Sequence, residues 1–465
     1  MSFTSLAFAA LLLVTYVVYW AAGADRRRLQ NGILLLASTV FYGWWDWRFL
    51  ALIALSILID YTVGRALGAA TGLRRRKVLL GVSLAVNLGL LGFFKYAGFF
   101  VESFRAAFSL GISSGFDMLD IVLPVGISFY TFQTLSYTID VYRRKLTPSN
   151  SLLDFATFVS FFPQLVAGPI ERATRLLPQF QAMREFHSGE AADGLRQMLW
   201  GFFKKLVVAN NCALLADQAF AAPESFSAPT LLVGLLAFTF QIYADFSGYS
   251  DIAIGTARLF GVSLSQNFAN PYFARTIPDF WRRWHISLST WFRDYVYIPL
   301  GGSRRGRRRT LINIAIVFVV SGLWHGAAWT FVAWGALHAL YMVLWIRLVP
   351  EGFASRGLTF LLVMLAWVLF RSPDIATAGQ YVSHLVNPGA WSARYQFGLS
   401  VTAIVMASTT IVGVAEFVLR NKRHGLAIAG LAWSRPQRWL SYALIIAFTL
   451  ILGRISDQPF IYFQF

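Results

Sequence analysis

The sequence predicts an all-α, polytopic membrane protein. Hydrophobic residues make up 57% of the 465 positions, charged residues only 13%, and the mean hydropathy is +0.57. Compositions this apolar are typical of chains that cross a lipid bilayer. The apolar stretches are continuous rather than alternating with polar residues, and about 20 helical residues span a hydrocarbon core roughly 30 Å thick. Both observations favour bundled helices over strands.

Thirteen apolar segments are candidates for membrane helices. Several are shorter than a full crossing, and such segments tilt or re-enter the membrane. We therefore expect about 11–13 transmembrane or re-entrant helices. The candidates, in chain order, cover residues 5–23, 32–45, 49–66, 78–98, 119–139, 152–168, 195–217, 229–247, 311–323, 327–346, 357–371, 397–419 and 437–453.

The net charge of +18 comes mainly from short basic clusters between the apolar segments. In a soluble chain this charge would suggest nucleic acid as a partner. Beside membrane helices it indicates orientation instead, because loops rich in Lys and Arg stay in the cytoplasm. Clusters at residues 26–28, 74–77 and 143–145 follow the first, third and fifth segments and so share one side. This pattern predicts a multi-pass protein in a lipid bilayer, with its C-terminus outside the cytoplasm and no nucleic-acid partner.

Residues 248–310 depart from this composition within what is otherwise one membrane-embedded domain, residues 1–465. The segment is amphipathic, and we expect a loop followed by a helix on the cytoplasmic side. Its interleaved aromatic and basic residues suit the headgroup level of a membrane. Arg282, Arg283 and Arg293 equally suit a second use, in which their guanidinium groups receive the phosphates of a cytoplasmic acyl donor. The residues leave both uses open.

His325 lies between apolar runs at residues 311–320 and 327–346. An ionisable side chain at membrane depth is energetically costly and marks a functional site by default. The alternative is that His325 only hydrogen-bonds a neighbouring helix. Cys212 is the only cysteine, which excludes intrachain disulfides and multi-cysteine metal sites. Because the sequence also has no glycine-rich phosphate loop or metal-spaced His and Cys residues, we expect no bound cofactor or metal.

Three separated motifs resemble the membrane-bound O-acyltransferase family. They are residues 162–170, FPQLVAGPI; residues 281–303, WRRWHISLSTWFRDYVYIPLGGS; and residues 322–326, GLWHG. The resemblance is greatest to the bacterial branch that contains the membrane subunits of alginate O-acetylation, with the D-alanine-transferring subunits of teichoic acid modification as cousins. It covers the chain from about the second apolar segment to the C-terminus.

The resemblance implies a helical shell around a central funnel or tunnel in the bacterial inner membrane. It also implies acetyl-CoA as the cytoplasmic donor substrate, with an exported acceptor polysaccharide or an extracytoplasmic acyltransferase as partner. The family's essential membrane-embedded histidine corresponds to His325, and its second histidine corresponds to His285. The choice of acetyl over D-alanyl or another acyl group depends on the resemblance alone.

The chemistry of acyl transfer supports these two residues independently. Transfer to a hydroxyl needs a base for the hydroxyl proton and donors for the developing oxyanion. Histidine, with an ordinary pKa of about 6.5, is well matched to the first task. We therefore predict His325 as the general base and His285 as a positioning or oxyanion-stabilising partner, while a covalent acyl-histidine stays open.

The last six residues, 460–465, read FIYFQF. One interpretation is an aromatic anchor at the membrane interface. The other follows from the resemblance, which implies that Tyr462 is a first acyl acceptor and passes the group outward.

Other polar residues receive structural interpretations. His338 is predicted to be a packing residue turned away from His325. It lies thirteen residues later, and at about 100° of helical rotation per residue the two side chains point in different directions. Lys204 and Lys205 are predicted to extend to a membrane interface rather than to bind substrate. Solvated or span-flanking positions are predicted for His187, His384, His424, Glu171, Asp245 and Asp251.

Two other classes of function fit the composition. A transporter or flippase for a lipid-linked sugar would share the apolar segments and basic loops, but it would not need the motifs around His285 and His325. A scaffold that only docks an outer transferase would tolerate loss of His325. Labelled acetyl-CoA distinguishes these classes, because a flippase should neither retain nor transfer the label.

Overall fold

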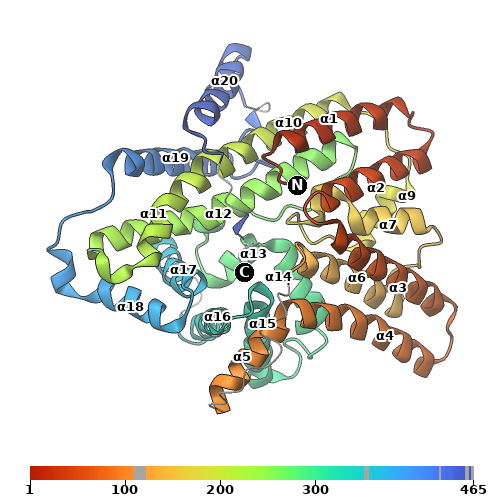
Figure 1. The fold of residues 1–465 in the computed structure, drawn as a ribbon, viewed down its shortest axis with the longest axis horizontal. Coiled ribbons are helices and arrows are strands. Elements are labelled where there is room, and N and C mark those ends of the chain that lie inside the picture. The colour runs from red at the N-terminus through yellow and green to blue at the C-terminus, as the bar shows by residue number, and fades with distance from the viewer. Residues whose placement is uncertain (109–121, 350–354, 429–430, 456–459, 462–465) are drawn as a thin grey trace. The chain divides into compact units, whose positions relative to one another are not determined.

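The computed structural model describes residues 1–108, 122–349, 355–428, 431–455 and 460–461 (Figure 1). Its contacts form two compact units. Unit 1 comprises Met1–Gly194 and Ala253–Ser265, and unit 2 comprises Leu195–Ile252 and Gln266–Phe465. A single functional domain over the whole chain stays a prediction.

The described chain is helical, and each of the predicted apolar segments overlaps a helix. Among the described residues, five continuous helices are both long and apolar enough to cross a membrane. They are Trp47–Ala69, Leu73–Phe108, Ala228–Leu259, Trp329–Leu348 and Leu399–Val418. These features confirm the predicted all-α, polytopic membrane architecture, whereas the central funnel or tunnel stays a prediction.

Unit 1 is built from α1 to α9, the start of α10 and the end of α12. The first nine helices are α1 (Leu6–Ala21), α2 (Arg27–Gly43), α3 (Leu50–Ala69), α4 (Leu73–Leu91), α5 (Ala97–Phe108), α6 (Ile127–Tyr142), α7 (Leu152–Ser160), α8 (Phe162–Leu165) and α9 (Ala173–Gln181). Helices α3, α4 and α6 pack on one another around a buried carboxyl group, that of Asp60. Asn87 and Thr138 donate to it at 2.9 and 3.1 Å, so polar contacts join the three helices.

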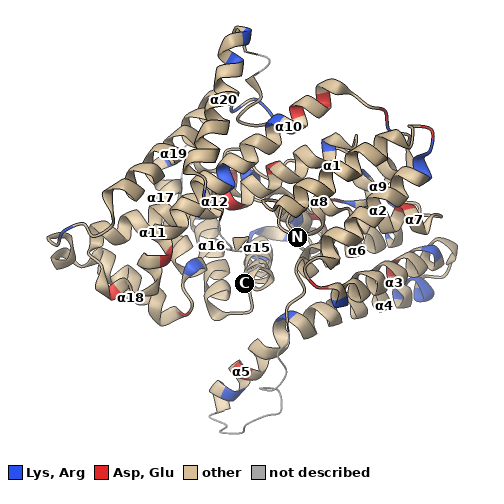
Figure 2. Ribbon diagram, turned by 45° about the horizontal axis from the view of Figure 1, so that its top comes forward, with Lys and Arg blue, Asp and Glu red and all other residues tan. Residues whose placement is uncertain are grey.

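Arg76 tests the predicted arrangement of the basic clusters. Its buried guanidinium donates to the carbonyl of Leu67 at the end of α3, and to those of Val141 and Tyr142 at the end of α6. The clusters at residues 74–77 and 143–145 therefore lie at the same end of this helix group, as the alternation of spans predicts. Figure 2 marks the basic and acidic positions along the ribbon.

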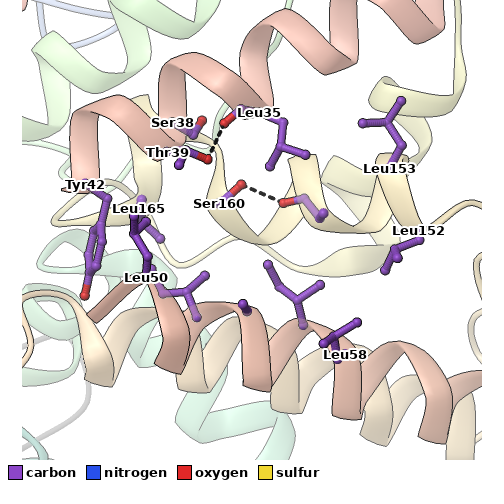
Figure 3. Close-up of a pocket in the computed structure, with 14 residues that line it drawn as sticks. Leu35, Ser38, Thr39, Tyr42, Leu50, Leu58, Leu152, Leu153, Ser160 and Leu165 are labelled. Carbon is purple, nitrogen blue, oxygen red and sulfur yellow. Dashed lines mark hydrogen bonds between the residues drawn. The ribbon is translucent and has the colours of Figure 1, made fainter. Parts of the chain in front are cut away.

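An apolar pocket of about 520 Å³ lies between α2, α3 and α7 (Figure 3). The hydroxyls of Thr39 and Ser160 are directed to the carbonyls of Leu35 and Ala156 in their own helices, so they present little polarity to the pocket. The pocket wall is therefore suited to contact with a hydrocarbon chain, and the pocket is not the candidate active site.

Unit 2 contains the rest of the chain. Its helices are the end of α10 (Ser188–Phe202), η4 (Phe203–Ala209), α11 (Asn210–Ala221), α12 (Ala228–Leu259), α13 (Ile277–Arg283), α14 (Ile286–Phe292), η7 (Arg293–Tyr297), α15 (Gly306–His325), α16 (Trp329–Leu348), α17 (Arg356–Arg371), α18 (Ile375–Val386), α19 (Leu399–Val418) and α20 (Arg435–Leu452). Helices α15 and α16 approach closely at two glycines. A Cβ on Gly322 would lie 2.2 Å from the Phe331 carbonyl oxygen, and one on Gly335 would lie 2.4 Å from that of Phe318. This contact fixes the C-terminal end of α15, where His325 lies.

The loop expected in the segment 248–310 does not begin at Gly248. Helix α12 continues through this residue to Leu259, and the irregular chain starts only after it. The reason is helix packing, because Gly248 and Gly201 face each other so closely that a Cβ on either would lie within 2.8 Å of the other's carbonyl oxygen. Gly248 is therefore a contact glycine rather than a helix end. After α12, the predicted loop and helix are observed as residues 266–270 followed by α13 and α14.

Candidate active site

His285 occupies the junction between α13 and α14 in a strained backbone conformation. Its φ is +43°, in the left-handed region that residues other than glycine seldom adopt. The main chain is held there because Ile286 N–H donates to the Asn267 carbonyl at 2.9 Å. Such conformations cluster at functional sites, where the surrounding structure enforces them.

The imidazole of His285 is buried and hydrogen-bonded to Asn267. The Nδ1 atom lies 3.2 Å from Asn267 Oδ1, and both residues are only 1% exposed. Ser287 donates to the same oxygen from its backbone N–H at 3.3 Å and from its hydroxyl at 2.8 Å. Burial lowers the pKa of His285 to about 3, so the ring is neutral at physiological pH.

His325 is the last residue of α15 and lies beside His285. The ring centroids of the two histidines are 6.4 Å apart, although forty positions separate them in the sequence. Trp324 contacts both rings, at 5.9 Å from His285 and 5.1 Å from His325. The structure therefore brings together the two residues predicted as catalytic.

Aromatic side chains form much of the surroundings of the histidine pair. Trp334 and Phe370 lie 5.1 and 5.4 Å from the His325 ring, and Phe246 lies edge-on to His285 at 4.6 Å. Such walls exclude water, and exclusion of water protects an activated acyl group from hydrolysis. The arrangement suits a reaction between a buried hydroxyl and an acyl donor.

The three arginines predicted to bind the donor lie nearer the surface than the histidines. Arg282 and Arg293 are 72% and 60% exposed. Arg283 pairs with Asp279 at 3.0 Å, and Arg293 pairs with Asp294 at 2.8 Å. Exposed guanidinium groups at the end of α13 and in η7 are compatible with phosphate binding or with a headgroup contact, so donor binding stays a prediction.

Tyr462, the predicted acyl acceptor, lies outside the described residues. The residues just before it are buried within unit 2, with Phe460 4.7 Å from the Tyr249 ring and 5.5 Å from that of Phe246. The Ile461 N–H donates to Asp245 Oδ2 at 2.9 Å. Because Phe246 also contacts His285, the Phe246 ring connects this part of the tail to His285. A surface anchor therefore does not describe Phe460 and Ile461.

The prediction that Lys204 and Lys205 reach a membrane interface is wrong. Both are buried, and they form ion pairs with Asp251 at 2.6 Å and Asp245 at 2.7 Å. The wider turn of the π-helix η4 directs the two ammonium groups toward α12. Asp245 and Asp251 lie within α12 rather than at its end, so their predicted flanking position is also wrong. The available signal for such pairing was two lysines in the apolar segment 195–217, with Asp245 in the next segment and Asp251 shortly after its predicted end.

The remaining histidines differ in burial. His187 is exposed and His384 is half-buried, as expected, but His424 is buried and accepts a hydrogen bond from Leu426 N–H at 3.2 Å. The predicted solvated position of His424 is therefore wrong, because the turn after α19 folds its ring inward.

His338 is fully buried and packs between Trp334 at 4.8 Å and Trp281 at 4.9 Å. Neither of its ring nitrogens has a hydrogen-bond partner within the described part of the chain. We expect His338→Leu to retain acyl transfer within about threefold, because Trp334 stands between it and His325. The melting temperature should stay the same or rise, since a buried polar group without a partner costs about 1–3 kcal/mol. Thermal unfolding in detergent and a label-transfer assay measure the two effects, and a loss of activity comparable to that of a His325 variant would contradict the structural role.

Within the described residues, no three His, Cys, Asp or Glu side chains are grouped as a metal site. Glu171 is buried and lies 3.6 Å from Arg175, four residues farther along the chain. Glu171 lies between α8 and α9 and so flanks a predicted apolar segment, as expected.

Comparison with known proteins identifies the family. A model of the membrane-bound O-acyltransferase family matches residues 143–354, which contain all three motifs. A probable alginate O-acetylase AlgI of Pseudomonas putida is 40% identical over the full length of both chains. The chain belongs to the membrane-bound O-acyltransferase family. The resemblance predicted from the three motifs is thereby confirmed, and the protein is an O-acyltransferase.

The names of two further relatives of this O-acyltransferase refer to other polymers. A peptidoglycan O-acetyltransferase of Helicobacter pylori is 33% identical over 93% of the chain and 91% of its own length. A teichoic acid D-alanyltransferase of Streptococcus thermophilus is 30% identical over 53% of the chain and 68% of its own length. The matches with O-acetylating relatives extend over more of the chain than the match with the D-alanyl-transferring relative.

Proposed function

We propose that this O-acyltransferase moves an acetyl group from acetyl-CoA toward the hydroxyls of an exported polysaccharide. The observation that carries the proposal is the buried histidine pair, whose rings lie 6.4 Å apart within aromatic walls. The relatives that match more than nine-tenths of the chain support acetyl as the group and a polysaccharide as the acceptor, because their names join O-acetylation to alginate and peptidoglycan. The D-alanyl-transferring relative matches only about half of the chain.

In the proposed reaction, His325 removes the proton of the acceptor hydroxyl as that oxygen attacks the thioester carbonyl. The new C–O bond forms, the C–S bond breaks, and the proton passes from His325 to the departing thiolate to give free CoA. His285 is neutral and acts as a positioning or oxyanion-stabilising partner. The surrounding tryptophans and phenylalanines keep bulk water from competing with the acceptor.

The direction of transfer follows from the basic loops. They support a cytoplasmic position for the ends near residues 74–77 and 143–145, and a C-terminus on the extracytoplasmic side of a bacterial inner membrane. Arg282, Arg283 and Arg293 would bind the phosphates of the donor. Tyr462 would receive the acetyl group first, and an extracytoplasmic acyltransferase or the polysaccharide itself would then take it.

The deciding experiment supplies purified protein in lipid with acetyl-CoA carrying a labelled acetyl group, and follows the label in protein, acceptor and water. We expect acceptor-dependent release of CoA together with labelled ester. Matched reactions with unlabelled acetyl-CoA plus labelled acetate control for exchange. Absence of both retained and transferred label would contradict the proposal and favour a flippase for a lipid-linked sugar.

A further inference from the structure

The contacts of Asn267 fix the direction of its side-chain amide. The backbone N–H of Ser287 lies 3.3 Å from Oδ1, and because a backbone N–H only donates, the atom facing it must be the amide oxygen. The Ser287 hydroxyl adds a second hydrogen bond at 2.8 Å, and the amide nitrogen faces the Ser250 hydroxyl at 3.4 Å. All of these residues are buried.

This direction determines where His285 carries its proton. An amide oxygen cannot donate, so the Nδ1 atom that lies 3.2 Å from it must bear the hydrogen. Since burial keeps the ring neutral, Nε2 then carries the lone pair. The same asparagine also holds the backbone, because its carbonyl accepts from Ile286 N–H and so supports the left-handed conformation of His285.

The lone pair on His285 Nε2 can accept a hydrogen bond from His325 because the two rings are close together. Ring nitrogens lie about 1.1 Å from the ring centre, so a centroid separation of 6.4 Å permits the nitrogens to approach to about 4 Å, which a bridging water or a small ring rotation spans. An acceptor at this position stabilises the imidazolium that forms when His325 takes the hydroxyl proton. A neutral Nδ1–H ring cannot at the same time donate to an oxyanion from Nε2.

We propose that Asn267 is a positioning residue that locks His285 in the Nδ1–H tautomer, so that His285 orients and stabilises His325 rather than the oxyanion. The chain of contacts is then Asn267 Oδ1, His285 Nδ1–H, His285 Nε2, His325 and the acceptor hydroxyl. The proposal rests on the proposed acyl transfer for its role, but the tautomer itself is a property of the resting protein.

The direct test is ¹⁵N NMR of histidine-labelled protein in lipid at pH 7, with the His285 signals assigned by difference from His285→Asn. We expect a protonated Nδ1 and an unprotonated Nε2. The opposite tautomer, or an imidazolium, would overturn the proposal. The measurement needs no substrate. If His285 has the Nδ1–H tautomer but the protein does not use acetyl-CoA, the proposed function is wrong, whereas the role of Asn267 in fixing the tautomer stands.

Variants connect the tautomer to transfer. Asn267→Leu removes the acceptor and should lower kcat on the order of 10²–10⁴-fold with little change in KM, as expected when a catalytic histidine adopts the wrong tautomer. Asn267→Asp keeps an acceptor oxygen and should keep both the Nδ1–H form and kcat within about tenfold. If Asn267→Leu does not fold, the Asp variant still decides. Loss of the Nδ1–H signal there contradicts the proposal, and so does loss of kcat in a variant whose His285 ring NMR shows to carry its single proton on Nδ1.

Ser287→Ala is the matched control. It removes a hydroxyl contact to the same oxygen of Asn267 and leaves the contact of that oxygen with His285. A decrease of less than tenfold, with the wild-type tautomer, supports a specific role of the Asn267–His285 contact. A decrease equal to that of Asn267→Leu would show that the network acts through general structure and would overturn the proposal.

Discussion

Replacing His325 by alanine is expected to lower the rate of acyl transfer by on the order of 10²–10⁴-fold, the usual contribution of a general base. The side chain is 3% exposed and packs against the rings of Trp334 and Phe370, so bulk water does not reach the position to act as a base in its place. Transfer of a labelled acetyl group, measured in single turnovers with purified protein in lipid, reports the loss. Binding of the donor should change little, because the predicted phosphate contacts lie on the exposed side of α13 and η7.

His338→Leu is the control for this experiment, since it also removes a buried histidine from the same group of aromatic side chains. A comparable loss in both variants would indicate damage to packing and would contradict a specific role for His325. Mass spectrometry adds a second criterion. If His325→Ala protein still accumulated acetyl groups on Tyr462, the proposed order of steps would be wrong.

The sequence predicts the features that depend on local pattern. Apolar runs of helical length locate the helices because the bilayer imposes both length and polarity on each one. The motifs around His285 and His325 identify the candidate pair. The distance between the two histidines could not be derived from their spacing, because forty residues separate them in the sequence. It depends on the left-handed backbone at His285 and on the close glycine contacts between α15 and α16. Only the resemblance to a family predicted that the fold would pair them.

The errors concern residues whose role depends on a partner that is distant in the sequence. Lys204 and Lys205 resemble residues that extend to an interface, and the π-helical turn that buries them leaves no mark in the hydropathy. Gly248 resembles a helix end because it precedes polar residues, yet it serves a close contact with Gly201. Asn267 attracts no attention in the sequence, and only its contacts with His285 and Ser287 show its importance.

The second large effect is expected at the ion pair between Lys205 and Asp245, which also holds the C-terminal tail through the Ile461 N–H. Replacing Asp245 alone by leucine should cost about 3–5 kcal/mol in the free energy of unfolding, because a buried ammonium is left without its partner. The double variant Lys205→Met/Asp245→Leu should recover most of this stability, since an apolar pair of similar size avoids the desolvation of two charges. Thermal and denaturant unfolding in detergent measure both changes.

The double variant separates stability from catalysis. It folds in our expectation, but it lacks the carboxylate that fixes Ile461, and misplacement of a reacting group by about 1 Å is enough to lower a rate by 10²-fold. Acyl transfer should therefore fall by about tenfold or more although the protein is stable. Lys204→Met/Asp251→Leu is the matched control, because it removes a similar buried ion pair between η4 and α12, whereas the Ile461 N–H donates to Asp245. Equal activity in the two double variants would show that the tail takes no part in acyl transfer. A loss confined to the Asp245 variant would make the anchored tail part of the route by which the acyl group leaves the histidine pair.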